Sequence, residues 1–250
     1  MIRSQIMSLN KTVIITGASS GIGLGLVKAF LDRGYNVVGN ARSRSGLDDA
    51  AGQLDHSARF IGVAGDIAAP ATSTQLIAQA IEAFGAVDGL VNNAGFFLPK
   101  PFVDYSPQDL ESLLDTNLKG LVYASQAAAA HMIGRRQGFI INISAAVALQ
   151  PNIQVPAALP VLIKGGVNQM TRALALELSP YNIKVNAVAP GIIDTPMHDP
   201  AHREFLNHLA PAGRVGTIGE IAEAVLYLAG ADFTTGAVLP VDGGMSTGKW

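Results

Sequence analysis

Three glycines near the start of the chain have the spacing needed to hold a phosphate group. Gly17, Gly21 and Gly23 stand between a predicted strand and a predicted helix. Gly17 permits a tight turn, Gly21 lets the backbone approach a pyrophosphate, and Gly23 lets helix and strand pack closely. The helix start adds free N–H groups and the positive end of its dipole. The segment predicts a dinucleotide-binding loop rather than an ordinary glycine-rich turn. The other residues predicted to line this loop are Ser19, Ser20 and Ile22.

The residues after the second predicted strand indicate which dinucleotide is bound. Proteins that bind NAD place an acidic residue there, about twenty positions after the glycines. This sequence has no carboxylate in that region before Asp48. Arg42 and Arg44 stand there instead, where they would neutralise a 2′-phosphate, so the sequence predicts NADP(H) in preference to NAD(H). The alternative is that both arginines belong to a solvated loop.

The elements that position these residues alternate between short apolar runs and helical patterns, which is typical of a parallel sheet covered on both faces. The predicted strands are Thr12–Thr16, Asn36–Asn40, Arg59–Val63, Gly89–Asn92, Gly138–Ser144, Lys184–Val188 and Ala237–Val241. The predicted helices are Gly21–Arg33, Thr72–Phe84, Pro107–Ile133, Pro160–Ser179 and Gly219–Ala229. We expect a single doubly wound, Rossmann-type α/β domain over residues 1–250, with about seven parallel strands and helices on both faces. Residues 194–211 fit no strand, and we expect a substrate lid there rather than a plain connection.

Six ordered motifs along nearly the whole chain resemble those of the short-chain dehydrogenase/reductase (SDR) family. They are the TGxxxGxG of the glycine loop, Gly65-Asp66-Ile67, Asn92-Asn93-Ala94-Gly95, Asn117 on a long helix, residues 186–197, and Val241-Asp242-Gly243-Gly244. The resemblance implies the fold predicted above and an NAD(P)-dependent oxidoreductase. It also implies packing through the long helices into a homo-oligomer, either a tetramer or a dimer. The cofactor-binding residues that it implies are Asp66, Ile67, Asn93, Ala94, Gly95, Lys164, Pro190, Gly191, Ile193, Thr195 and Met197.

The resemblance also implies four catalytic residues, and this chain departs from the family at two of them. The family uses a Ser, a Tyr four positions before a Lys, and an Asn. Lys164 and Asn117 match the Lys and the Asn, but Pro160 stands at the Tyr position. No Tyr occurs between residues 123 and 181, so no shift of register restores one. Ala145 stands at the Ser position with Ser144 one step earlier, where a strand points its side chain to the opposite face.

The missing Tyr leaves the source of a proton open. Reduction of a carbonyl produces an alkoxide that must be protonated. The amine of Lys164 is one candidate if burial lowers its pKa, and a water held by Asn117 and Lys164 is another. The lid offers further candidates in His198, His202 and His208. Ser144 is either misdirected or recruited through a local bulge, and we expect it to be misdirected.

These observations predict an NADP(H)-preferring dehydrogenase/reductase with an atypical active site. It would interconvert a small hydrophobic carbonyl and an alcohol, with Asn117, Lys164 and Ser144 as candidate catalytic residues. The alternative is a catalytically silent NADP-binding sensor or oligomer subunit, and a weaker one is non-redox chemistry such as isomerisation. The run Phe96–Leu98 predicts an apolar mouth to the site, although core packing would explain it equally well.

The composition excludes several classes of protein. The 250 residues contain 17 Lys and Arg against 19 Asp and Glu, a net charge of −2, which argues against electrostatic binding of nucleic acid. The absence of Cys excludes disulfide scaffolds, zinc–thiolate sites and cysteine nucleophiles, and we predict no metal site. The uncharged stretch 137–163 is broken by three prolines, so we expect no membrane span. We predict a cytoplasmic protein with a small-molecule substrate.

Overall fold

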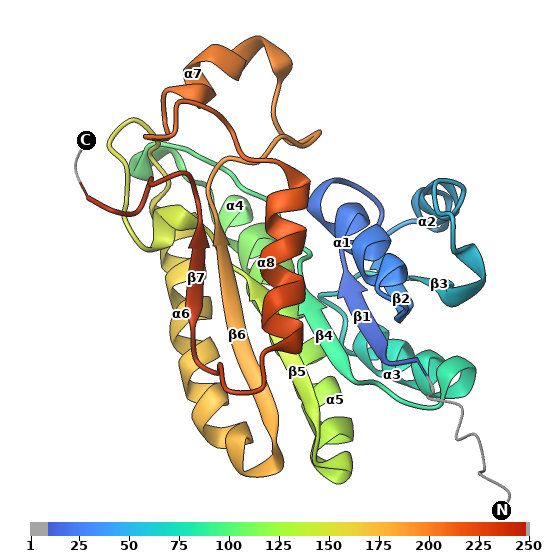
Figure 1. The fold of residues 1–250 in the computed structure, drawn as a ribbon. Helices are drawn as coiled ribbons and strands as arrows, with labels where there is room; N and C mark the ends of the chain where they lie inside the picture. The colour runs from blue at the N-terminus through green and yellow to red at the C-terminus, as the bar shows by residue number, and fades with distance from the viewer. Residues whose placement is uncertain (1–9, 249–250) are drawn as a thin grey trace, which may run out of the picture.

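Seven parallel strands form one sheet in the computed structural model, which describes residues 10–248 (Figure 1). The strand order is β3-β2-β1-β4-β5-β6-β7. The strands are β1 (Thr12–Thr16), β2 (Asn36–Ala41), β3 (Phe60–Ala64), β4 (Gly89–Asn92), β5 (Gly138–Ile143), β6 (Ile183–Pro190) and β7 (Val238–Val241). The order reverses between β1 and β4, and such a switch point opens a crevice at the carboxyl ends of the strands. The predicted doubly wound sheet is confirmed.

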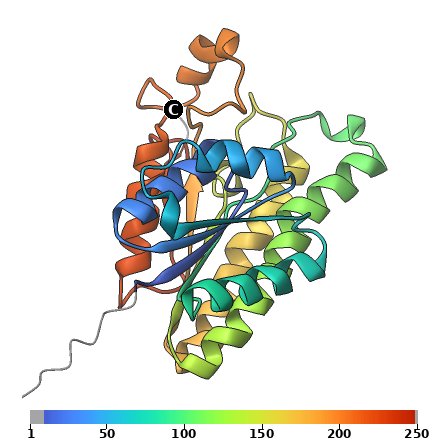
Figure 2. The ribbon, with the colours of Figure 1, turned by 90° about the vertical axis from the view of Figure 1, so that its right-hand side faces the viewer.

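Helices cover both faces of the sheet (Figure 2). One face carries α1 (Gly21–Asp32) and α8 (Ile218–Gly230), and the other carries α3 (Pro70–Phe84), α5 (Gly120–Arg135) and α6 (Ala158–Leu178). Successive residues of a strand point to opposite faces. Val13 and Ile15 therefore pack in the first layer, whereas Ile14 packs in the second. Both layers are apolar, which explains why the strands are continuous hydrophobic runs.

Two helical regions differ from the sequence prediction. The predicted helix Pro107–Ile133 consists of α4 (Pro107–Leu114) and α5, joined by a π-helical turn at Asp115–Lys119. The short helix α2 (Arg44–Ala51) was not predicted. Its buried residues are Leu47 and Ala50, and so few apolar anchors leave almost no periodic signal.

The segment predicted as a lid follows β6 and rises beyond the carboxyl ends of the strands (Figure 1). It contains a short turn at Pro200–His202 and helix α7 (Arg203–Asn207). An ion pair of 2.5 Å joins the Arg203 guanidinium to the Asp194 carboxylate. None of the helices within residues 10–248 is both long enough and apolar enough to cross a membrane.

Candidate active site

The glycine loop between β1 and α1 forms a backbone cradle. Gly17 has a φ of +68°, and a Cβ there would lie 2.9 Å from the Cα of Ala94. A Cβ on Gly23 would overlap the carbonyl oxygen of Gly17. Ser20 caps α1 without any side-chain hydrogen bond, so the N–H groups of the first turn remain available to a phosphate. The loop therefore fits the pyrophosphate of a dinucleotide.

Hydrogen bonds hold the ends of β1 and β4 together beneath this cradle. The Asn93 carboxamide donates to the carbonyl oxygens of Thr16, at 2.9 Å, and Gly17, at 3.2 Å. The backbone N–H groups of Asn93 and Ala94 donate to Oγ1 of Thr16, both at 3.0 Å. Asn93 and Ala94 thus form the floor of the crevice at the switch point.

The segment after β6 closes the other side of the cradle. A Cβ on Gly21 would lie 3.6 Å from Cβ of Thr195, so this segment reaches across to the glycine loop. Pro190 ends β6 in a buried position, and Gly191 packs against the backbone of Asp242. Ile193 is buried in the core, whereas Met197 is exposed. Thr195 therefore lies against the glycine loop, at the edge of the place where a dinucleotide would bind.

The far end of the crevice carries the residues predicted to hold the adenosine half. Arg42 is exposed after β2. Arg44, in contrast, donates to the carbonyl oxygen of Gly62 at 2.8 Å. Asp66 is exposed after β3 and accepts from the Ala68 N–H at 2.9 Å. Ile67 is buried in the core, so only its backbone is left to face a ligand.

The start of α2 belongs to the same end of the crevice. The Ser43 hydroxyl caps α2 by accepting from the Gly46 N–H at 3.2 Å. A Cβ on Gly46 would lie 3.5 Å from Cβ of Ser19, so α2 begins beside the glycine loop. Sequence reasoning missed Ser43. The available signal was a capping residue followed by Leu47 and Ala50 at helical spacing.

Lys164 and Asn117 converge at the inner end of the crevice. A Cβ on Gly95 would lie 2.5 Å from Oδ1 of Asn117 and 3.6 Å from Nζ of Lys164. Nζ of Lys164 donates to the carbonyl oxygen of Ile143 at 2.8 Å. Burial of the ammonium group lowers the pKa of Lys164 from 10.5 to about 8.

The side-chain oxygen of Asn117 accepts no hydrogen bond from the described residues. Asn117 lies in the π-helical turn, is 3% exposed, and donates through Nδ2 to the Leu113 carbonyl oxygen at 3.2 Å. Its buried Oδ1 has no hydrogen-bond partner within residues 10–248. A buried acceptor of this kind is costly unless a water or ligand donates to it. The oxygen is therefore suited to hold a water beside Lys164.

The other positions predicted to match the family's catalytic set, Ser144 or Ala145 and Pro160, carry no ionisable side chain. Ser144 is 5% exposed, and its hydroxyl donates to Oδ1 of Asn168 on α6 at 2.6 Å. Pro160 is buried in the first turn of α6, where a missing N–H is tolerated. Ala145 follows Ser144 and is partly exposed. Asn168 was missed in the sequence, where nothing links residues 24 positions apart.

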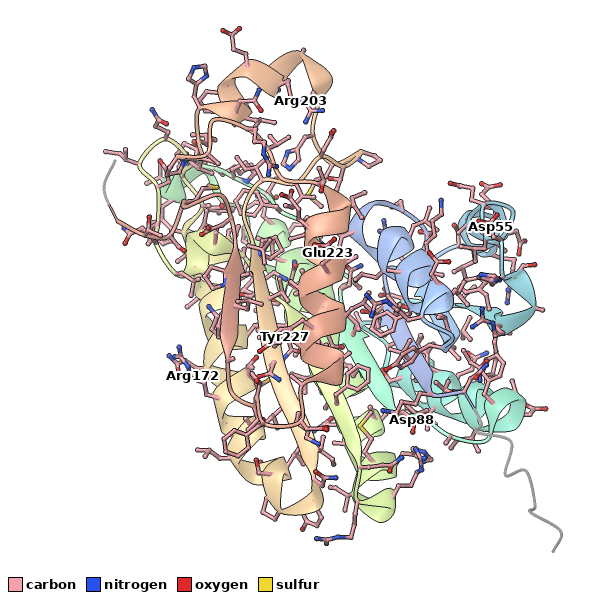
Figure 3. The ribbon with its side chains drawn as sticks, viewed as in Figure 1. Asp55, Asp88, Arg172, Arg203, Glu223 and Tyr227 are labelled. Carbon is pink, nitrogen blue, oxygen red and sulfur yellow. The ribbon has the colours of Figure 1, made fainter. Side chains whose placement is uncertain are left out.

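The three lid histidines have surroundings other than Lys164 in the part of the chain that the structure describes. His198 lines a small cavity with Asp194 and Arg203, and burial lowers its pKa. A ring nitrogen of His208 lies 2.7 Å from the carbonyl oxygen of Glu204. His202 is exposed. Figure 3 shows Arg203 on this segment, beyond the carboxyl ends of the strands. Within residues 10–248 no hydrogen bond joins a lid histidine to Lys164.

Comparisons with known proteins agree with this geometry. Residues 17–246 match the family model described as enoyl-(acyl carrier protein) reductase. The chain is 38% identical to a 3alpha-hydroxysteroid dehydrogenase of Mediterraneibacter gnavus, with 95% of this chain and 97% of that protein covered. It is 35% identical to a 3-oxoacyl-(acyl-carrier-protein) reductase of Chlamydia muridarum, with 95% and 98% covered.

Solved structures show the same fold with nicotinamide dinucleotides bound. ElxO with NADP bound has a TM-score of 0.91 at 28% identity, covering 96% of this chain and all of that one. A Tyr-to-Phe variant of ElxO has been solved with NADPH bound. The 3-ketoacyl-(acyl-carrier-protein) reductase of Brucella melitensis, complexed with NADH, has a TM-score of 0.89 at 32% identity, with the same coverage. The fold, the crevice and these matches together establish that the chain belongs to the short-chain dehydrogenase/reductase family of NAD(P)-dependent oxidoreductases.

Proposed function

We propose that the protein is an NADP(H)-preferring dehydrogenase/reductase that interconverts a small hydrophobic carbonyl and an alcohol without a Tyr acid. The observation that carries this proposal is the convergence of Lys164 Nζ and the unpartnered Asn117 Oδ1 at Gly95. A pKa of about 8 gives Lys164 both protonation states near neutral pH. An acid or base with such a pKa is matched to proton transfer at that pH.

The residues of this chain bind and orient the dinucleotide, and they transfer a proton to or from the substrate. The bound dinucleotide supplies or accepts the hydride. The glycine loop and Thr195 hold its phosphates, and Asn93 with Ala94 forms the floor that orients it. In the reducing direction, Lys164 releases a proton from Nζ through a water on Asn117 Oδ1. In the oxidising direction, the neutral amine of Lys164 takes the proton back.

The positive charge after β2 supports the preference for NADP(H). Arg42 is exposed beside the start of α2, and Asn40 fills the end of β2 by donating to the Val63 and Gly65 carbonyl oxygens, both at 3.1 Å. No carboxylate stands there to bind ribose hydroxyls. The Arg42→Asp variant should lose at least about tenfold in NADPH affinity while NADH affinity holds, because a guanidinium–phosphate bond is charge-assisted. Fluorescence titration with both nucleotides measures this, and an equal loss for both would refute the preference.

Introducing the Ser and Tyr of the family at positions 145 and 160 tests whether the wild type has a proton donor of its own. The double variant Ala145→Ser, Pro160→Tyr and the wild type are compared for NADPH consumption with small ketones and diketones. Turnover by the wild type supports an atypical donor. The Lys164→Ala variant should then lose turnover even at saturating NADPH, and normal turnover would exclude Lys164 from the chemistry.

A specific observation supports the catalytically silent alternative. The Ser144 hydroxyl is directed to Asn168, and Pro160 is buried without a donor. A sensor or oligomer subunit would bind NADPH tightly without oxidising it. Turnover by the double variant alone would favour this reading, whereas repeated turnover by the wild type would exclude it.

We also propose a homo-oligomer, a tetramer or a dimer, built through α6. Leu162 and Leu176 on this helix are 65% and 82% exposed and stand four turns apart near one face. Ala124 and Ala128 of α5, by contrast, pack in the core of the subunit. Sedimentation of the Leu162→Glu, Leu176→Glu variant tests this assembly, which predicts a shift to smaller species.

A further inference from the structure

The place next to Lys164 lacks the hydroxyl groups that would activate a carbonyl oxygen. Ser144 donates to Asn168, and Lys164 donates to Ile143. Residues 145–163 include no Ser, Thr, Tyr, His, Asp or Glu. A substrate oxygen here would face the Lys164 ammonium and no hydroxyl group from residues 145–163. The acceptor must therefore be electrophilic without a hydroxyl hydrogen bond.

Acceptors differ in how basic their oxygen becomes when hydride arrives. A simple ketone becomes an alkoxide, whose conjugate acid is about as weak as water, with a pKa of about 15.7. A quinone becomes a phenolate, whose conjugate acid resembles the Tyr phenol, with a pKa of about 10. The phenolate is less basic by about six powers of ten. It needs no hydroxyl donor during hydride transfer, and an ammonium with water nearby is sufficient.

The surroundings of the site fit a flat apolar molecule. Phe96 directly follows Gly95 and is 36% exposed, and the exposed Met197 lies two residues beyond Thr195. Ala146 packs with Leu209 in a small apolar cluster that joins the residues after β5 to the lid. An aromatic ring against the exposed side chains of Phe96 and Met197 would bury apolar surface without leaving a polar group unpaired.

We infer, on the basis of the proposed function, that the substrate is a quinone that the protein reduces to a hydroquinone, with the Lys164 ammonium facing the phenolate oxygen of the product. The quinone accepts a hydride from the reduced dinucleotide, whose C–H bond breaks as a new O–H bond forms on one quinone oxygen. The second oxygen becomes the phenolate. It takes a proton from Lys164, and water returns a proton to the amine.

A matched pair of acceptors tests the substrate class. Naphthoquinone and tetralone share a fused two-ring skeleton, but tetralone is a simple ketone. We expect the wild type to reduce naphthoquinone with a kcat/KM more than about 1,000-fold above that for tetralone, after subtraction of the protein-free rate. The intrinsic reactivity of the two acceptors is the same for every protein, so the informative quantity is the change in this ratio between the wild type and the variant. In the Ala145→Ser, Pro160→Tyr variant the ratio should fall at least tenfold, because tetralone gains its hydroxyl donors.

The outcomes separate this inference from the proposed function. Efficient reduction of tetralone by the wild type, with the ratio unchanged in the double variant, overturns the quinone class and leaves the oxidoreductase standing. Binding of NADPH without oxidation by either acceptor in the wild type overturns both. Reduction of tetralone by the double variant in that case identifies a silent protein.

A binding measurement tests the same inference without turnover and without the double variant. Nitrophenol resembles the hydroquinone anion, and its ionised form is yellow. At a saturating concentration of NADP, the wild type should bind nitrophenolate and increase the yellow absorption at a pH where free nitrophenol is mostly neutral. Lys164→Met should bind at least tenfold more weakly, and Lys28→Met, at an exposed position of α1, should bind as the wild type does. Binding of the neutral form by the wild type would overturn the inference.

Discussion

The lowered pKa of Lys164 results from the position of its side chain in the fold. Its side chain lies between α6 and the end of β5, and the ammonium group finds one backbone acceptor, Ile143, in place of the water it loses. Desolvation disfavours the charged form, so the pKa falls to about 8. The same burial that suits the residue to proton transfer near neutral pH therefore weakens the folded state.

The Lys164→Met variant should be more stable than the wild type at pH 7. The lowering of the Lys164 pKa from 10.5 to about 8 corresponds to about 3 kcal/mol at pH 7, at about 1.4 kcal/mol per pKa unit. The hydrogen bond lost in the variant costs about 1 kcal/mol, so the net gain is about 2 kcal/mol. Between pH 8 and 10.5 the unfolded wild type binds more protons than the folded one. Wild-type stability therefore rises with pH in that window, and the advantage of the variant shrinks.

Denaturant unfolding of the cofactor-free protein at pH 7, 9 and 10.5 measures this difference. Lys28→Met, at an exposed position, serves as the control and should change stability by less than about 0.5 kcal/mol. A Lys164→Met variant less stable than the wild type at pH 7 would show that the ammonium is not desolvated.

Among the elements, the contact between α1 and α8 depends on a missing side chain. A Cβ on Gly25 would overlap Cγ2 of Ile218, so Gly25 sets the distance between the two helices. This contact holds α1 over the sheet, and the start of α1 forms part of the proposed dinucleotide cradle. Packing on this face therefore positions the cofactor site.

A pair of glycine substitutions separates packing from helix propensity. Gly25→Ala should lower the free energy of unfolding by about 1–3 kcal/mol, because overpacking shifts the helices apart. In Gly134→Ala, on α5, the new Cβ has no described atom within 4 Å, so the change should stabilise the protein by up to about 1 kcal/mol. Thermal unfolding with and without NADPH measures both, and shifts of the same sign would contradict the packing argument.

On the scale of the whole molecule, Asp88 links several elements at the end of the sheet opposite the proposed active site. Figure 3 shows Asp88 and Arg203 at opposite ends. The Asp88 carboxylate accepts from the Thr12 N–H at 2.8 Å, from Arg135 at 3.0 Å and from Gln137 at 3.2 Å. It thereby links β1, the end of α5 and the approach to β5.

Removing this carboxylate should destabilise the fold without altering the site. Asp88→Ala leaves a buried N–H and a partly buried guanidinium unpaired, at a cost of about 2–4 kcal/mol. NADPH affinity of the folded protein should be unchanged. Asp55→Ala, an exposed control, should stay within about 0.5 kcal/mol of the wild type. Denaturant unfolding and nucleotide titration test this, and a loss of affinity at unchanged stability would contradict it.

The sequence by itself determined the strands, most of the helices and the dinucleotide loop. Strand bounds predicted from apolar runs differ from the structure by at most two residues. Such runs are local and are sufficient for a sheet buried on both faces. Gly17 and Gly23 were identified because a turn and a close packing contact leave no room for a side chain. The sequence also predicts that Pro160 stands where the family has its Tyr.

Only the tertiary structure decided where the polar side chains end up. Ser144 is hydrogen-bonded to Asn168, which lies 24 residues later in the sequence. Asn117 and Lys164 both lie close to Gly95. Neither pairing has a periodic signal, because each depends on how α5 and α6 settle against β4 and β5. The lowered pKa of Lys164 has the same origin, since desolvation is a property of the packed surroundings and not of the residue.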